Sequence, residues 1–261
     1  MLTINDKLGF DNIINAEDIL NSPIVKNALD YANKYEKQLE DLTQDDLDSA
    51  EQTAIKKLLP SWWDYELKVQ EDNDKKEEIY KEGLIAHPES YEIMGNYANL
   101  LEKLDRDDEA ESYYLKALEI DPNHANNNGN YAILLAKLNR DDEAETYYLK
   151  ALKIEPNNTN INGNYAQFLL VKGEKEKATP YIENAFKYLK EENDLTIELW
   201  FYRLAHYPTY FEEAKQEIDK VLNEGNMSID WDFSKNIEQA KKEGHPNIEL
   251  LEEYADKITK K

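Results

Sequence analysis

Apart from carboxylates, this 261-residue chain holds few of the side chains that usually catalyse reactions or bind metals. Its histidines are far apart, and none lies in the zinc-binding spacing H-E-x-x-H: His87, His124, His206 and His245. The chain has no cysteine, which excludes thiol catalysis, disulfides and sulfur-ligated metals. It also lacks a Walker loop, a dinucleotide glycine fingerprint and a G-x-S-x-G elbow. We therefore expect no enzyme, no cofactor and no metal site.

The carboxylates are abundant but do not form a recognisable motif. The 55 Asp and Glu residues exceed the 31 Lys and Arg residues, giving a formal net charge of −24 that is spread evenly along the chain. With so many carboxylates, some pairs reach a glycosidase-like separation by accident, so a pair alone indicates no activity. The even spread favours a solvated, self-repelling surface, and the alternative is electrostatic steering toward a basic protein. Both interpretations predict no nucleic-acid ligand and no anionic membrane.

The expected location follows from what the sequence lacks. No apolar run approaches the roughly 18 residues of a membrane-spanning helix. The first twenty residues carry acids, unlike a secretory leader: Asp6, Asp11, Glu17 and Asp18. Because the absence of cysteine also fits a reducing compartment, we expect a cytoplasmic protein.

A repeat of 34 residues is the strongest pattern in the chain. Residues 91–124 and 125–158 are identical at 23 of 34 positions. A diverged third copy, 159–192, keeps the Gly-Asn-Tyr-Ala sequence and two spaced alanines. A period of this length predicts an architecture of stacked supersecondary units.

Each copy has apolar residues at helical spacing twice over. In the first copy, one stripe consists of Tyr97, Ala98, Leu101 and Leu104, and the other of Ala110, Tyr113, Tyr114, Ala117, Leu118 and Ile120. The intervening Asp105-Arg106-Asp107-Asp108 predicts an aspartate N-cap and an acidic first turn, and Pro122 ends the second helix. Each copy is therefore predicted to be a hairpin of two amphipathic helices.

The offsets of these residues resemble the tetratricopeptide repeat (TPR) family, whose pattern is W-x2-L-G-x2-Y…A-x3-F…P. The matching positions in the first two copies are Met94 and Asn128, Tyr97 and Tyr131, Ala98 and Ala132, Leu101 and Leu135, Ala110 and Ala144, Tyr114 and Tyr148, and Pro122 and Pro156. In the third copy Ala178, Ile182 and Ala185 fit, but Lys190 replaces the proline. The resemblance implies an all-α, right-handed α-solenoid of TPR-type helical hairpins, with diverged capping helices at both ends.

The rest of the chain is predicted to extend this solenoid. We expect an N-terminal helical cap over 1–56, a degenerate repeat over 57–90, three TPR repeats over 91–124, 125–158 and 159–192, and a diverged hairpin with capping helices over 193–261. Helices are expected near 23–40, 44–59, 73–88, 194–205 and 211–222, followed by a short helix and a final amphipathic one. The adjacent Trp62 and Trp63, and the aromatic segment 198–206, belong either to the core or to a contact surface.

The resemblance also implies a binding surface, because the first helix of each hairpin lines a concave groove in a TPR stack. The groove positions are rich in amides, with lysines at the edge: Asn96, Asn99, Lys103, Asn126, Asn130, Lys137, Asn160, Asn164 and Gln167. Amides both donate and accept hydrogen bonds without carrying charge, which suits the main chain of an extended peptide. The recurrence of Asn at one helical position reflects either this function or inheritance by duplication, since Asn is a poor helix former.

One known ligand class of the family is not expected here. Its co-chaperones grip a C-terminal carboxylate with lysines, an arginine and asparagines, and Asn99 and Asn130 match the amides of that clamp. Gly95, Asn160 and Asn164 stand where its basic residues are required. We therefore predict no binding of chaperone tails.

The leading hypothesis is a non-enzymatic adaptor that binds a protein or peptide segment, and a basic one is compatible with the charge. The alternative is an acidic inhibitor or immunity-type protein that masks a basic toxin or nuclease. A third possibility, an enzyme with its site in the first 60 residues, is disfavoured because that segment has neither histidine nor cysteine.

Overall fold

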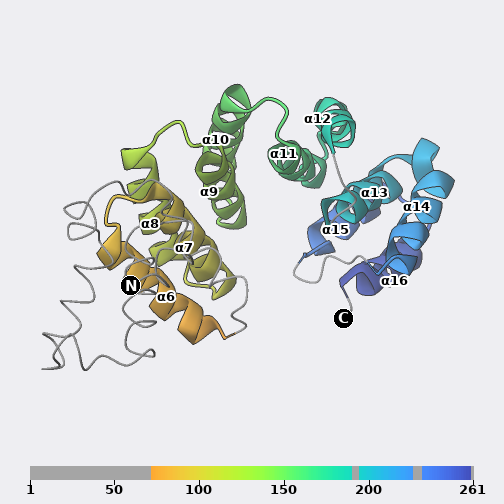
Figure 1. Cartoon of the computed structure of the whole chain (residues 1–261). Coiled ribbons are helices and arrows are strands. Elements are labelled where there is room, and N and C mark those ends of the chain that lie inside the picture. The colour runs from red at the N-terminus through yellow and green to blue at the C-terminus, as the bar shows by residue number, and fades with distance from the viewer. Residues whose placement is uncertain (1–71, 190–193, 226–230, 260–261) are drawn as a thin grey trace, which may run out of the picture. The chain divides into compact units, whose positions relative to one another are not determined.

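The computed structural model describes residues 72–189, 194–225 and 231–259, and every regular element in these ranges is helical. They fall into two compact units, divided between Ile120 and Asp121 (Figure 1). The predicted cap over 1–56, the helices near 23–40 and 44–59, and Trp62 and Trp63 lie outside the described residues.

The first unit contains α6 (Asn73–Ala86), α7 (Tyr91–Lys103) and α8 (Asp107–Ile120). α7 and α8 form a hairpin, and α6 packs against α7. Asp72 caps α6 by accepting a hydrogen bond from the backbone N–H of Asp74 at 2.9 Å. Tyr80 of α6 stacks on Tyr97 of α7 with ring centroids 5.4 Å apart, which joins the helix to the hairpin.

The second unit contains three helical hairpins, and the turn of the third is longer than the turns of the other two. These are α9 (Ala125–Lys137) with α10 (Asp141–Ile154), α11 (Thr159–Val171) with α12 (Lys175–Tyr188), and α13 (Asp194–His206) with α14 (Phe211–Asn223), joined by the 3-10 turn η2 (Pro208–Tyr210). Two more helices follow, α15 (Ser234–Lys242) and α16 (Ile248–Thr259). Successive hairpins pack through α9 and α10 on α11, and through α11 and α12 on α13. The all-α prediction of stacked helical hairpins is confirmed.

The turn inside each repeated hairpin bends at one left-handed residue. The backbone φ of this residue is 56° at Asp105, 59° at Asn139 and 76° at Gly173. Asp, Asn and Gly are residue types that tolerate this conformation. Arg140 occupies the N-cap of α10 without a side-chain hydrogen bond to the backbone N–H groups of the first turn. Its guanidinium pairs with Glu143 at 2.7 Å. The left-handed Asn139 lies one residue before the cap.

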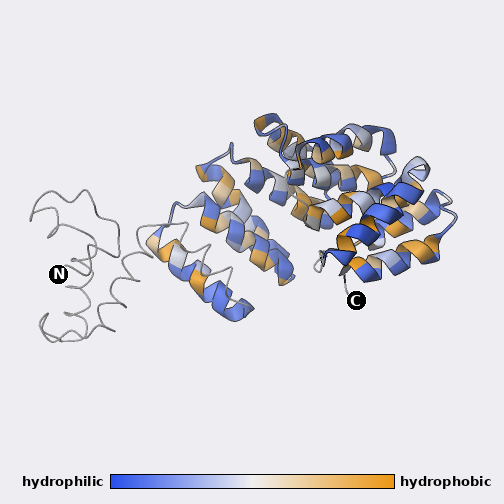
Figure 2. Ribbon diagram, turned by 45° about the vertical axis from the view of Figure 1, so that its right-hand side comes forward, coloured by the Kyte–Doolittle hydropathy of each residue, from blue (hydrophilic) through white to orange (hydrophobic). Residues whose placement is uncertain are grey.

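Small residues allow the helices of each hairpin to approach closely. Ala98, Ala110 and Ala117 of the first unit are fully buried, as are the equivalent residues of the second unit: Ala132, Ala144 and Ala151. Hydrophobic residues line the sides of the helices that face their neighbours, and hydrophilic residues cover the other sides (Figure 2). Each helix therefore buries its apolar stripe only by pairing.

Two buried asparagines stand where the family pattern has tryptophan. Asn162 Nδ2 donates to the carbonyl oxygens of Pro156 at 2.9 Å and Asn158 at 2.7 Å. Asn128 Nδ2 makes the equivalent bonds to Pro122 at 3.1 Å and His124 at 2.8 Å. The amide thus closes the turn between repeats, which explains why the substitution is compatible with the fold.

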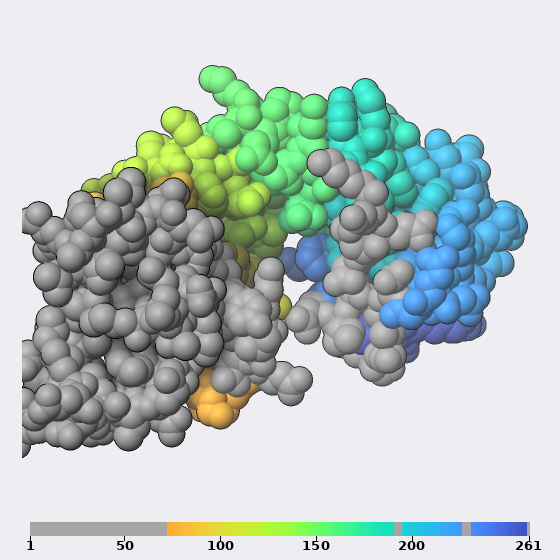
Figure 3. Space-filling model, in the orientation of Figure 1, coloured from red at the N-terminus to blue at the C-terminus, as the bar shows by residue number. Residues whose placement is uncertain are grey.

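α13 is the centre of the second unit. It packs against α11, α12, α14, α15 and α16, and its residues from Leu195 to His206 are buried except for Trp200. Figure 3 shows the surface of helices around α13, with α12 in teal and α14 in light blue. The aromatic segment 198–206 therefore forms core, as one of its two interpretations predicted.

Candidate binding surface

The predicted groove residues lie on the first helix of each repeated hairpin, and they differ in what their side chains do. In the first unit, Asn96 and Asn99 of α7 are half-buried and Lys103 is exposed at its end. Asn99 Oδ1 accepts a hydrogen bond from the Tyr114 hydroxyl of α8. The amide oxygen of Asn99 therefore helps to join α7 to α8.

In the second unit, four asparagines form what we call the amide row: Asn126 and Asn130 on α9, and Asn160 and Asn164 on α11. Each pair is four residues apart, so its members lie on one side of their helix. Asn126 and Asn160 are exposed, and Asn130 and Asn164 are half-buried. Asn126 Oδ1 accepts from Asn158 Nδ2 at 3.2 Å, which holds its amide in place across the two helices. Lys137 is exposed at the end of α9.

Close approach of the first helices depends on glycine. A Cβ added to Gly129 would lie 3.2 Å from Ile161 Cγ1, and one added to Gly163 would lie 2.8 Å from Leu195 Cδ1. The glycines thus let α9 approach α11, and α11 approach α13, next to the amide row. The helices that carry the row are therefore held close together by contacts between a glycine and an apolar side chain of the next first helix.

The amides of the third repeat end at Gln167, which the protein itself engages. Gln167 Nε2 donates to Asn236 Oδ1 of α15 at 3.2 Å, and Asn236 Nδ2 lies 3.3 Å from His206 Nε2 of α13. Sequence reasoning predicted α15 but not that it lies over α11 and α13. Its apolar spacing, Phe233, Ile237 and Ala240, indicates that it packs, without indicating the surface on which it does so.

His206 is a buried polar residue at the end of the aromatic segment 198–206. Its side chain is fully buried, and its Nδ1 lies 3.7 Å from Glu243 Oε2. Desolvation lowers the pKa of His206 to about 4, although the nearby Glu243 carboxylate acts in the opposite direction. The imidazole is therefore neutral at pH 7 and serves as a hydrogen-bonding partner for Asn236.

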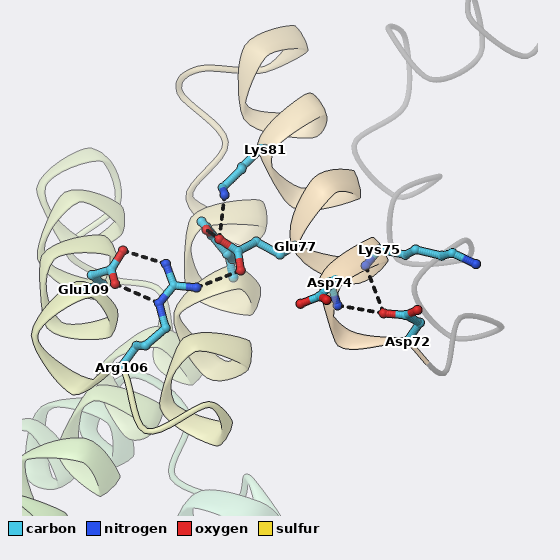
Figure 4. Close-up of polar contacts among 8 residues, drawn as sticks. Asp72, Asp74, Lys75, Glu77, Lys81, Arg106 and Glu109 are labelled. Carbon is cyan, nitrogen blue, oxygen red and sulfur yellow. Dashed lines mark hydrogen bonds and ion pairs between the residues drawn. The ribbon is translucent and has the colours of Figure 1, made fainter.

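The first unit carries a network of charges that joins α6 to the hairpin turn (Figure 4). Glu77 of α6 pairs with Arg106 at 2.7 Å and with Lys81 at 2.6 Å, and it accepts from the Tyr97 hydroxyl at 2.9 Å. The bonds from Lys81 and Arg106 lower the pKa of Glu77 to about 2. Arg106 also pairs with Glu109 at 2.7 Å, so one guanidinium bridges α6 and α8.

A metal site and a membrane span each have requirements that the described residues do not meet. Within the described ranges, no three His, Asp or Glu side chains are grouped so as to hold a metal ion. In the same part of the chain no helix is both long and apolar enough to cross a membrane. Two depressions of the second unit lie beside Arg203 and Tyr181, with volumes of about 40 Å³ and about 320 Å³.

Comparison with known proteins identifies the repeats. Residues 89–156 and 147–179 match tetratricopeptide repeat families. No curated protein sequence matches the chain.

Solved structures share the fold at low sequence identity. PilW, a type IV pilus biogenesis factor, has a TM-score of 0.53 and 21% identity, covering 80% of this chain and 99% of that one. A tetratricopeptide repeat protein from Parabacteroides merdae has a TM-score of 0.51 and 14% identity, covering 90% and 97%. Pseudomonas aeruginosa PilF has a TM-score of 0.50 and 15% identity, covering 93% and 100%. At these identities the likeness establishes the fold.

Proposed function

Because the chain is a tetratricopeptide repeat protein over residues 89–179, we propose that it is a non-enzymatic adaptor that binds a peptide or protein segment on the first-helix face of its repeats. Repeats of this family serve in general for protein–protein interaction. The proposal places the partner in the second unit on the amide row, Asn126, Asn130, Asn160 and Asn164.

The observation that carries the proposal is the recurrence of half-buried asparagine at one position of α9 and α11. Asn130 and Asn164 are 34 residues apart and occupy the same site in successive repeats. An amide at such a site presents both a donor and an acceptor, as the main chain of an extended segment requires. Asn is costly inside a helix, by a few tenths of a kcal/mol to about 0.7 kcal/mol relative to Ala, so the recurrence calls for a compensating role.

A capture experiment on the full chain tests this function. The tagged protein is compared with Asn130→Ala/Asn164→Ala for the proteins that each retains from native cytosol. The matched control is Asn157→Ala, an exposed asparagine in the turn before α11. We expect a partner that the control retains and the double variant loses. A partner retained equally by all three would contradict the role of the amide row.

The net charge of −24 supports a second candidate, masking of a basic toxin or nuclease. Asp108 and Asp142, at the start of α8 and α10, are exposed and could make such contacts. In the same capture experiment, a masked partner would survive the asparagine substitutions and leave at moderate salt. That outcome would favour the acidic surface over the amide row.

A further inference from the structure

We propose that Asn126 of the amide row is held as a hydrogen-bond donor, so that the partner segment presents a carbonyl oxygen to it. The inference rests on the proposed function and adds the polarity of one contact to it. It starts from the turn between α10 and α11, where three side-chain hydrogen bonds of Asn158 decide which end of the Asn126 amide remains for a partner.

The backbone of α11 sets the orientation of the Asn158 amide. Asn158 is the N-cap of this helix, and its Oδ1 accepts a hydrogen bond from the backbone N–H of Ile161 at 3.1 Å. Because a backbone N–H only donates, the atom that caps the helix must be the oxygen, and the other end of the amide is the Nδ2 donor. Nδ2 donates to Glu155 Oε2 at 2.7 Å. A carboxylate only accepts, so this second contact requires the same orientation.

Asn158 in turn sets the orientation of Asn126. The Nδ2 group of Asn158 donates to Asn126 Oδ1 at 3.2 Å. Turning the Asn126 amide over would place one NH2 group against another and lose this bond. A hydrogen bond of this kind corresponds to roughly a two- to tenfold difference in population. The oxygen of Asn126 therefore faces Asn158 most of the time.

The Nδ2 group of Asn126 is the end that a partner meets. Asn126 is exposed, and its Nδ2 makes no hydrogen bond to another residue in the part of the chain that the structure describes. An NH2 group only donates, so the matching group is an oxygen acceptor, which the main chain of a peptide segment supplies as its carbonyl. In the same part of the chain, Asn130, Asn160 and Asn164 have no comparable bond, and their amides can present either end. Asn126 is therefore the member of the row that selects an acceptor.

Two variants separate the orientation of Asn126 from the capping of α11. Asn158→Ser keeps a capping oxygen but is too short to hold Asn126. Ser90 shows that serine serves at this position of the repeat, because its Oγ accepts from the backbone N–H of Ile93 at 3.3 Å. Asn158→Asp/Glu155→Gln, which we call the reversed pair, keeps both a capping oxygen and the net charge. The second oxygen of the new carboxylate accepts from Asn126 Nδ2, which turns the Asn126 oxygen toward the partner.

NMR relaxation of the side-chain amides in the free full-length protein tests the orientation without a ligand. We expect the Asn126 amide to be more ordered than that of Asn160, its exposed equivalent on α11. In Asn158→Ser the two amides should become equally mobile, and in the reversed pair Asn126 should stay ordered. Equal mobility of Asn126 and Asn160 in the wild type would overturn the proposal.

A binding measurement tests the polarity of the contact. The probe is a peptide selected against the wild-type full chain from a phage-displayed library of random sequences, synthesised with blocked ends and a fluorescein label. Asn158→Ser should weaken its binding by no more than about twofold, because a freely turning amide still presents its donor half of the time. The reversed pair should weaken binding by roughly three- to tenfold, because an acceptor then faces the carbonyl of the peptide. Glu155→Gln alone is the control for the lost carboxylate, and it should bind as the wild type does because its side-chain oxygen still accepts from Asn158.

The outcomes separate the two proposals. If Asn130→Ala/Asn164→Ala weakens binding while the reversed pair binds as tightly as the wild type or more tightly, the donor contact of Asn126 is refuted and the adaptor function stands. If no peptide is selected, or if the double alanine variant binds as the wild type does, the adaptor function of the amide row is refuted. In that case the relaxation measurement still decides the orientation of Asn126.

Discussion

At the scale of single residues, Glu77 is a carboxylate that joins α6 to the hairpin of the first unit. It is 14% exposed and has three partners: Lys81 on α6, Tyr97 on α7 and Arg106 in the turn after α7. We expect Glu77→Gln to lower the free energy of unfolding by about 1–2 kcal/mol, because the ionic bonds to Arg106 and Lys81 are lost. The free energy is measured by urea unfolding at pH 7.

The pH dependence of Glu77 follows from its lowered pKa. A glutamate in the unfolded chain has a pKa of 4.5 and folded Glu77 has a pKa of about 2, so its contribution is complete above pH 4.5 and is lost as the pH falls toward 2. Wild type and Glu77→Gln should therefore converge in stability over this range. Glu109→Gln removes an exposed partner of the same arginine and should have the smaller effect. Equal effects of the two substitutions would count against the burial of Glu77.

His206 predicts a second pH effect, in the other unit. Burial lowers its pKa from 6.5 to about 4, so the folded protein binds fewer protons than the unfolded chain between these values. The contribution of the neutral imidazole is complete above pH 6.5 and falls by up to about 3 kcal/mol as the pH drops to 4.

In His206→Gln we expect the stability to change less with pH over this interval. His87→Gln, at the C-cap of α6, is the control and should retain the wild-type slope. Urea unfolding at several pH values from 4 to 7 measures these slopes. If His206→Gln kept the wild-type slope, the loss of stability between pH 6.5 and 4 would not come from His206.

At the scale of elements, Ala144 tests the packing of the repeats. It is fully buried in α10, which packs on α9 and α11. Ala144→Trp should lower the free energy of unfolding by about 3 kcal/mol or more, since the close helices cannot accommodate an indole. Thr146→Trp, on the exposed side of α10, adds the same ring and should be tolerated. Unchanged melting of Ala144→Trp would refute the packing of this helix.

The helices and hairpins could be predicted because their signals are local. Alanine at fixed offsets, Pro122 and Pro156 after the second helices, and Gly225 and Gly244 after α14 and α15 all act within a few residues. The groove residues could be assigned to a helix face for the same reason.

The position of α15 could not be predicted, because it depends on contacts between residues far apart in the sequence. Asn236 bonds to Gln167, 69 residues away, and neither residue has a sequence signal for the other. The contact of His206 with Asn236 has the same origin, since α11, α13 and α15 meet only in the folded chain. Local patterns therefore assign residues to helix faces but do not indicate that α15 packs on α11.

At the scale of the whole molecule, the net charge of −24 makes salt the variable that separates the two functions. An affinity carried by the uncharged amide row should fall less than about threefold between roughly 50 and 300 mM salt, because few charges are screened. Masking of a basic partner by the acidic surface should weaken about 100-fold or more over the same range. The measurement is a salt titration of the Kd for the captured partner.

Matched variants decide how such a titration is interpreted. Asp108→Asn/Asp142→Asn removes two exposed acids outside the amide row and should leave the binding of an adaptor partner unchanged. The same substitutions should weaken a masked basic partner most at low salt, where the field of the acids extends furthest. If the Kd is insensitive to salt and to the loss of these acids, but rises when Asn130 and Asn164 are replaced, the charge serves solubility and the amide row performs the recognition.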